Sequence, residues 1–274
     1  MSGNPTGKEV LRASLGLFRQ DRHLIVLPLL AAVTALVTLA AVGLPIVAAL
    51  GASRVGIAVA LLAAGVVSAS ATLLFNVALV FAATERIEGR TPTVCGSLAM
   101  AWGRRATILR WALLAAVVGT LARTLERRFG VFGRLLGLAG AFAWAVATFL
   151  VLPVLAFEDL GPRQALRRSS SLLEERFGTV TRSGLRFGVL FGSWLVAATA
   201  VVLVGAMLVP ASHVLGGGLV IVGIFGVLAV AMYASAASIY LRTILYRFSL
   251  GLSVPELGVD LTAVLSKSRE PAWS

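Results

Sequence analysis

The sequence predicts an all-α, polytopic membrane bundle of six transmembrane helices, built from three pseudo-repeats with amphipathic helices on the cytoplasmic leaflet. Two observations favour this fold class. Charged residues make up only 13% of the 274 residues, whereas soluble domains carry about 25%. Long apolar stretches also alternate with short basic ones along the chain. A deficit of charge suits a lipid-facing surface, because a charge at the bilayer centre is costly.

Six apolar stretches are each expected to cross the bilayer, which takes about 20 residues of helix. They cover residues 23–50, 56–84, 108–122, 135–157, 183–210 and 215–245. The first stretch is longer than the ~7–15 apolar residues of a secretory signal, and 22 residues precede it. We therefore expect it to be retained as a transmembrane helix.

Four further stretches combine an apolar stripe at helical spacing with a polar, mostly basic face. They cover residues 8–20, 92–105, 162–177 and 255–267. Three of them begin with a proline, which the first helical turn tolerates because its missing N–H would have no partner there. Thr91, just before Pro92, is expected to cap its helix. Helices of this composition lie in the membrane interface.

One amphipathic helix followed by two spans occurs three times, and the fourth amphipathic helix closes the chain. The sequence identity between these repeats is low. We expect a single six-helix transmembrane domain over residues 1–250 and a short cytoplasmic amphipathic tail over residues 251–274.

The orientation of the bundle follows from the basic residues between the spans. Five of the 24 Lys and Arg residues fall on one side of the membrane, which leaves 19 on the side of both termini. The five are Arg54, Arg123, Arg127, Arg128 and Arg134. Cytoplasmic loops carry the excess of Lys and Arg. We therefore expect a multi-pass protein of the cytoplasmic membrane with both termini in the cytoplasm.

The charge of the chain also bears on its partners. In a soluble protein, a net charge of +12 and a pI near 11.5 would suggest nucleic acid. Here the basic residues lie beside apolar spans, so a bilayer with anionic headgroups is the expected partner and nucleic acid is not. A membrane-protein partner or a second copy of the chain is a further possibility. Cys95 is the single cysteine, which excludes an internal disulfide and a cysteine-cluster metal site.

Several stretches of the chain resemble a known family. They are LFRQDRHL at 17–24, FNVALV at 75–80, WALLAAVVGT at 111–120 and, most specifically, ATFLVLPVLAFE at 147–158, continued through 161–169. Together they are similar to an uncharacterised prokaryotic family of six-span membrane proteins, catalogued as a domain of unknown function. The resemblance covers about residues 8–250. It implies the six-span topology and carries no activity, substrate or catalytic residue.

Signatures of catalysis are missing from the sequence. There is no phosphate-binding glycine loop with a lysine, no histidine pair at zinc spacing and no serine elbow. His23 and His213 lie at opposite ends of different spans, and no carboxylate lies in the middle of a span. We therefore expect no enzyme activity, no metal site and no cofactor. Only a meeting of Glu85 or Glu158 with His23 would revive an enzymatic role.

The third span is short between its charges. Only 12 uncharged residues separate Arg110 from Arg123, which is roughly 18–20 Å of helix, whereas the hydrocarbon core is about 30 Å thick. Either both arginines reach the interface along their aliphatic stems, or one of them faces a polar groove and binds an anion or a lipid headgroup. Arg127 and Arg128 follow on the outward side and are candidates for a headgroup clamp or a partner surface.

The polar residue Asn76 and a set of glycines inside the spans each have two possible roles. Asn76 in the second span needs a hydrogen-bond partner in hydrocarbon, and it is expected either to join two helices or to line a polar path. Gly184, Gly188 and Gly192 are spaced by four residues in the fifth span. Small residues at this spacing let helices approach closely. We expect them to pack within the bundle, with a homodimer seam as the alternative.

Glu85 and Glu158 follow the second and fourth spans, where the helix dipole is already negative. Each therefore needs a basic partner. The arginines near them in sequence are Arg86, Arg105, Arg167 and Arg168. We expect structural ion pairs that hold the interfacial helices in place, with a gating role as the alternative.

Two functions are consistent with these features. The first is a non-enzymatic membrane protein that organises lipid or scaffolds a membrane complex. The second is a permease-like transporter of a lipid or an amphipathic anion, with Arg110, Arg123 and Asn76 lining its path. Convergence of these three side chains on one cavity would favour transport, and their dispersal to the interfaces would favour scaffolding.

Overall fold

The structure is a computed structural model that describes residue 16 and residues 21–51 and 53–252. All regular structure in these residues is helical. The elements are η1 (Arg22–Ile25), α2 (Val26–Leu50), α3 (Arg54–Ile87), α4 (Val94–Gly103), α5 (Arg105–Ala147), α6 (Val151–Phe157), α7 (Pro162–Leu208) and α8 (His213–Ser249). The predicted amphipathic stretches 8–20, apart from residue 16, and 255–267 lie outside the described residues.

Six helical stretches are long and apolar enough to cross a membrane, which indicates a multi-pass membrane protein. They are His23–Leu50, Arg54–Ile87, Arg105–Ala122, Ala139–Phe157, Gly188–Leu208 and His213–Ser249. Each overlaps one of the six predicted spans. The all-α class and the number of spans therefore agree with the sequence-based expectation.

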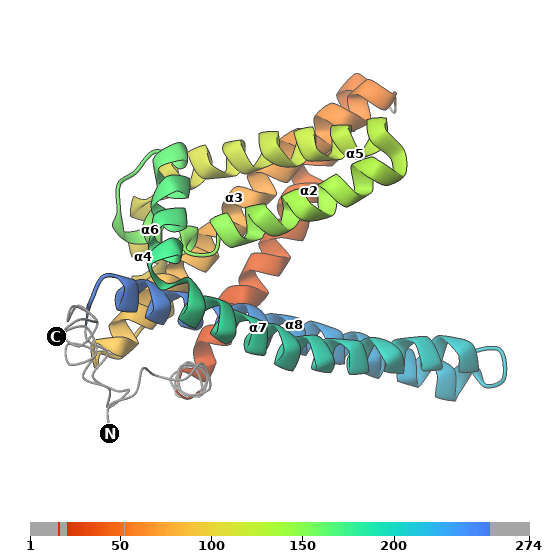
Figure 1. The fold of residues 1–274 in the computed structure, drawn as a ribbon. Helices are drawn as coiled ribbons and strands as arrows, with labels where there is room; N and C mark the ends of the chain where they lie inside the picture. The colour runs from red at the N-terminus through yellow and green to blue at the C-terminus, as the bar shows by residue number, and fades with distance from the viewer. Residues whose placement is uncertain (1–15, 17–20, 52, 253–274) are drawn as a thin grey trace.

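The helices form three arms that spread from one packed end of the molecule (Figure 1). The α2–α3 arm turns at Gly51, whose φ of 74° suits glycine. In the same turn, a side chain at Gly56 would collide with the carbonyl oxygen of Gly51. Further along this arm, the Ser68 hydroxyl donates a hydrogen bond to the Ala35 carbonyl at 3.0 Å. This bond joins the two antiparallel helices inside the predicted membrane region.

The second arm is α5 alone, which doubles back on itself. In a straight helix Trp111 and Trp144 would be about 50 Å apart, yet their rings stack with centroids 5.9 Å apart and an interplanar angle of 11°. Figure 1 shows the α5 ribbon running out and back. The segment 123–134, expected as a connection between two spans, belongs to this helix. The arm then breaks at residues 148–150 and continues as α6.

The third arm pairs α7 with α8, and the two helices come close together at Gly205 and Gly223. A side chain at Gly205 would lie 2.7 Å from the Val220 amide nitrogen, and one at Gly223 would lie 2.6 Å from the Val202 side chain. By contrast, nothing among the described residues lies within 4 Å of a side chain built at Gly188 or Gly192.

The packing role expected for Gly184, Gly188 and Gly192 therefore stays a prediction, and the surroundings of Gly184 lie outside the described side chains. At 3.6 residues per turn, Gly205 lies on a different face of α7 from Gly188 and Gly192. Spacing by four shows that small residues share a face. It does not show which face meets a neighbour.

Two of the predicted amphipathic helices also differ from expectation, one in its end and one in its cap. The stretch 162–177 is not a separate interfacial helix, because α7 continues unbroken from Pro162 to Leu208. The stretch 92–105 does form a separate helix, α4, but Thr93 rather than Thr91 caps it. The Thr93 hydroxyl accepts a hydrogen bond from the Gly96 amide at 3.2 Å, and its extended backbone is the usual conformation of an N-cap.

The buried core lies where the three arms meet, and we call this region the base. It comprises residues 75–87 of α3, residues 150–158 at α6, residues 162–173 of α7 and residues 236–249 of α8, together with α4 and residues 21–27. Six of the seven residues of α6 are buried. The base therefore has the packing of a protein interior, whereas the arms expose most of their apolar side chains.

Candidate functional site

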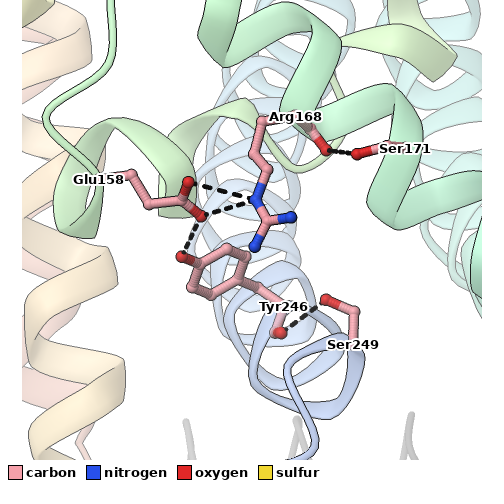
Figure 2. A network of polar contacts seen from close by, with 5 residues as sticks. All are labelled: Glu158, Arg168, Ser171, Tyr246 and Ser249. Atoms are coloured by element: carbon pink, nitrogen blue, oxygen red, sulfur yellow. Dashed lines mark hydrogen bonds and ion pairs between the residues drawn. The ribbon is translucent and has the colours of Figure 1, made fainter.

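Glu158 is the centre of a polar contact that joins three elements of the base (Figure 2). Its carboxylate directly follows α6 and accepts hydrogen bonds from Arg168 Nε on α7, at 3.2 Å to each oxygen. It also accepts a bond of 2.8 Å from the Tyr246 hydroxyl on α8. We call these three residues the Glu158 centre. They connect segments up to 88 positions apart in the sequence.

Aromatic rings surround one side of this centre. The Phe157 ring stacks on the Tyr246 ring, with centroids 6.0 Å apart, and meets the edge of the Phe81 ring at 5.4 Å. The other side is more open, because the side chains of Glu158 and Arg168 are 24% and 39% exposed. Arg168 uses only its Nε on Glu158, and in Figure 2 its two terminal nitrogens point away from the carboxylate.

Asp21 is the centre of a second, fully buried contact. Arg86, at the end of α3, donates from Nε to Oδ2 at 2.7 Å and from a terminal nitrogen to Oδ1. The Tyr240 hydroxyl on α8 donates to Oδ2 at 3.1 Å. We call these three residues the Asp21 centre. A two-point arginine–carboxylate contact is among the strongest polar interactions in proteins, so it fixes the start of the first span against α3 and α8.

Three weaker ion pairs of the described residues, formed by two carboxylates, lie at the rim of the base. Glu88 accepts from Arg90 at 2.6 Å and from Arg247 at 2.8 Å. Asp159 lies 3.8 Å from Arg104. The carboxylates are 37% and 82% exposed, so solvent screens these pairs and each contributes about 0–1 kcal/mol.

Glu85, Glu158, Arg167 and Arg168 are the residues predicted to form ion pairs. The structure pairs two of them, Glu158 and Arg168. Arg167 is exposed, and Glu85 is half-buried. Among the described residues, neither makes an ion pair. Glu88, three residues further on, is the carboxylate paired with arginines there.

Sequence reasoning missed the Asp21 centre and both tyrosines. A signal was available, because two of the three tyrosines of the chain fall in the sixth predicted span and the third, Tyr246, directly follows it. Asp21 was also visible as a lone acid directly before the first apolar stretch. Nothing local indicated that Tyr240, 219 residues later in the chain, would be its partner.

The residues predicted to bind an anion do not form one cluster in the described part of the chain. Arg110 is exposed near the start of α5, and Asn76 is half-buried in α3 without a side-chain hydrogen bond in the described residues. No contact joins these two side chains among the described residues. The side chains of Arg123, Arg127 and Arg128 lie outside those that the structure describes.

The candidate acid–base and metal residues are likewise apart. The His23 ring nitrogen Nε2 lies 3.3 Å from the Pro92 carbonyl oxygen, and His213 begins α8. Among the described residues, no three His, Cys, Asp or Glu side chains are grouped so as to hold a metal. Cys95 is exposed on α4.

Comparison with known proteins identifies a family. The model of a family described as "Family of unknown function (DUF6159)" matches residues 55–249. This range contains Arg86, Glu158, Arg168, Tyr240 and Tyr246, and it begins after Asp21. The resemblance to a family of unknown function is confirmed. No curated protein and no solved structure matches the chain.

Proposed function

Since the chain belongs to DUF6159, a family of unknown function, we propose a role from its own architecture. It is a non-enzymatic, multi-pass protein of the cytoplasmic membrane that organises lipid or scaffolds a membrane complex. One observation carries the proposal: the carboxylates Asp21 and Glu158 of the base are each paired with an arginine, while the arms expose apolar surface. The molecule thus has one packed end and three lipid-facing extensions.

The pairing of the buried carboxylates supports a structural role for them. Asp21 and Glu158 each accept hydrogen bonds from one arginine and one tyrosine. A general acid or base instead needs a proton position open to a substrate. Neither carboxylate contacts His23, the meeting that would favour an enzyme, in the described part of the chain.

The exposure of the arms supports contact with lipid or with other membrane proteins. Only 6% of the apolar window in Gly188–Leu208 is buried within the chain, against 39% in Ala139–Phe157. Large side chains such as Leu36, Phe142, Trp194 and Phe225 are exposed on the three arms. Divergent arms present more such surface than a closed bundle of six helices would.

The basic rim of the base supports a cytoplasmic position for this end. Exposed arginines there include Arg90, Arg105, Arg110, Arg163 and Arg167. Each basic residue near an anionic leaflet adds about 1 kcal/mol of attraction. In this arrangement both termini and the base lie on the cytoplasmic side.

The proposal is tested by native mass spectrometry together with a flux assay in proteoliposomes. We expect the gently released protein to retain phospholipid or a partner protein, and we expect no protein-dependent movement of fluorescent phospholipid or of organic anions. Flux that is lost in R110L or N76A would overturn the proposal and establish the permease alternative.

The orientation is tested at Cys95, the single cysteine. A membrane-impermeant maleimide is expected to label it in inside-out vesicles and not in intact cells, with C95S as the control for background. Labelling of intact cells would place the base on the outside.

A further inference from the structure

Arg242 on α8 differs from the other partly buried arginines because no carboxylate among the described residues pairs with it. Five arginine side chains in the described part of the chain are partly buried. Four of them, Arg86, Arg104, Arg168 and Arg247, lie within 3.8 Å of a carboxylate oxygen. Arg242 is the fifth, and it makes no ion pair with a described residue.

The surroundings of Arg242 do not compensate its charge. Its guanidinium lies over the Phe149 ring, 4.9 Å from the centroid. Its Nε is enclosed and has no hydrogen-bond partner among the described residues. The terminal nitrogens also have no partner in that part of the chain, but they are not enclosed. One aromatic ring attracts a cation more weakly than burial penalises it, so an anion bound to the guanidinium would stabilise Arg242.

The position of Phe149 is fixed by the base. It lies in the break between α5 and α6, where the next amide, that of Leu150, donates to the Ser169 hydroxyl on α7 at 3.1 Å. Arg168 is the neighbour of Ser169 in α7, and its terminal nitrogens have no partner among the described residues. One turn beyond Arg242 on α8, Tyr246 contacts the same Glu158 that Arg168 does. Both guanidinium groups thus contact the segment around α6, Arg242 through Phe149 at its start and Arg168 through Glu158 at its end.

We propose that Arg242, stacked on Phe149 and with Arg168 nearby, binds the phosphate of an anionic phospholipid headgroup at the cytoplasmic end of the bundle. Resting on the proposed function, this inference names the lipid group that the base holds. The planar fork of a guanidinium matches a phosphate in two-point contact. Basic pockets between transmembrane helices on the cytoplasmic side hold such headgroups.

The test compares lipid retention by wild type, R242Q, R242K and R163Q in native mass spectrometry with added phosphatidylglycerol. R163Q is the matched control, because Arg163 is an exposed arginine at the start of α7. Loss of charge-assisted hydrogen bonds is expected to weaken retention about 10- to 100-fold in R242Q. R163Q removes one charge of the rim and is expected to weaken retention at most about fivefold. R242K keeps the charge without the fork, so it should lie between them.

Equal retention in wild type and R242Q would overturn the site, as would wild type that retains no phosphatidylglycerol. If R242Q does not fold, the test uses R242K instead. Folded R242K that retains as much phosphatidylglycerol as wild type would overturn the two-point contact.

Inorganic phosphate distinguishes the two sources of the anion. In one outcome, phosphate raises the thermal unfolding midpoint of wild type and leaves that of R242Q unchanged, while wild type retains no lipid. This result would identify free phosphate as the ligand and overturn the lipid assignment. Failure of the proposed function is read separately: protein-dependent flux would overturn the scaffold role and leave the phosphate site standing.

Discussion

The Asp21 and Glu158 centres have the same composition and different surroundings. In each, a carboxylate accepts from an arginine and from a tyrosine of α8. The Asp21 side chain is fully buried and bonds both of its oxygens to Arg86. The Glu158 side chain is 24% exposed and meets only Nε of Arg168. The comparison teaches that burial, more than the list of partners, sets how strongly each centre resists disruption.

The difference follows from where each carboxylate lies in the chain. Asp21 is enclosed by the ends of α3 and α8, and its own carbonyl accepts the Leu24 amide at 2.8 Å as η1 begins. Glu158 starts the connection from α6 to α7, and only one side of it is covered by rings. Water can therefore replace a lost partner at Glu158 but not at Asp21.

The largest expected effect is at the buried centre. D21A leaves the Arg86 guanidinium in the base without its carboxylate, and we expect it to lower the free energy of unfolding by about 3–5 kcal/mol. Unfolding in mixed micelles of rising SDS fraction measures the change. The double variant D21A/R86M should recover part of the loss, because the charge that faced Asp21 is then removed as well. A loss of unfolding free energy below about 1 kcal/mol in D21A would contradict the expectation that the Asp21 centre stabilises the fold more than the Glu158 centre does.

The second effect is at the half-open centre. E158A is expected to lower the free energy of unfolding by about 1–2 kcal/mol, since its hydrogen bonds to charged and hydroxyl groups are partly replaced by water. The same SDS titration applies, with E85A as the control for removing a nearby acid that makes no ion pair in the described residues. A loss as large as that of D21A would show that exposure does not separate the centres.

The hydroxyls of Tyr240 and Tyr246 allow the two centres to be compared by removing one hydrogen bond from each. Y240F and Y246F each remove a hydroxyl and keep the ring, so each is expected to lower stability by about 0.5–1.5 kcal/mol. The larger loss is expected in Y240F, because Asp21 has no access to water. The reverse order in chemical denaturation would contradict the ranking by burial.

The smallest effect is expected at the exposed rim. E88Q removes a carboxylate that is 37% exposed and paired with Arg90 and Arg247. The expected loss is within about 0.5 kcal/mol, and it should shrink further at high salt because exposed charges are screened. If the thermal unfolding midpoint falls by as much in E88Q as in E158A, the rim ion pairs contribute more to stability than their exposure indicates.

The spans were predictable because length and apolarity are local properties. All six predicted spans overlap helices of sufficient length in the structure. The helix breaks were less predictable. Residues 123–134 contain several arginines and were expected to be a connection, but they belong to α5. Arginine, leucine and glutamate are good helix formers, so charge marks where lipid contact ends and not where a helix ends.

The pairings were predictable only where they are close in sequence. Arg168 lies ten residues from Glu158 and was among its expected partners. Arg86 lies 65 residues from Asp21, and Tyr240 lies 219 residues from it. The sites of close packing, Gly205 and Gly223, were missed for a related reason. A helix shows the same spacing on several faces, and only its neighbour selects one.

The sequence by itself determined that this is an all-α chain with six apolar helices able to cross a membrane, because those properties depend on short-range composition. Only the tertiary structure decided that the helices spread as three arms from a common base. It also decided which arginines meet carboxylates there and that Arg242 meets an aromatic ring instead. Such pairings depend on how helices far apart in the chain are rotated against one another, and no local pattern encodes that rotation.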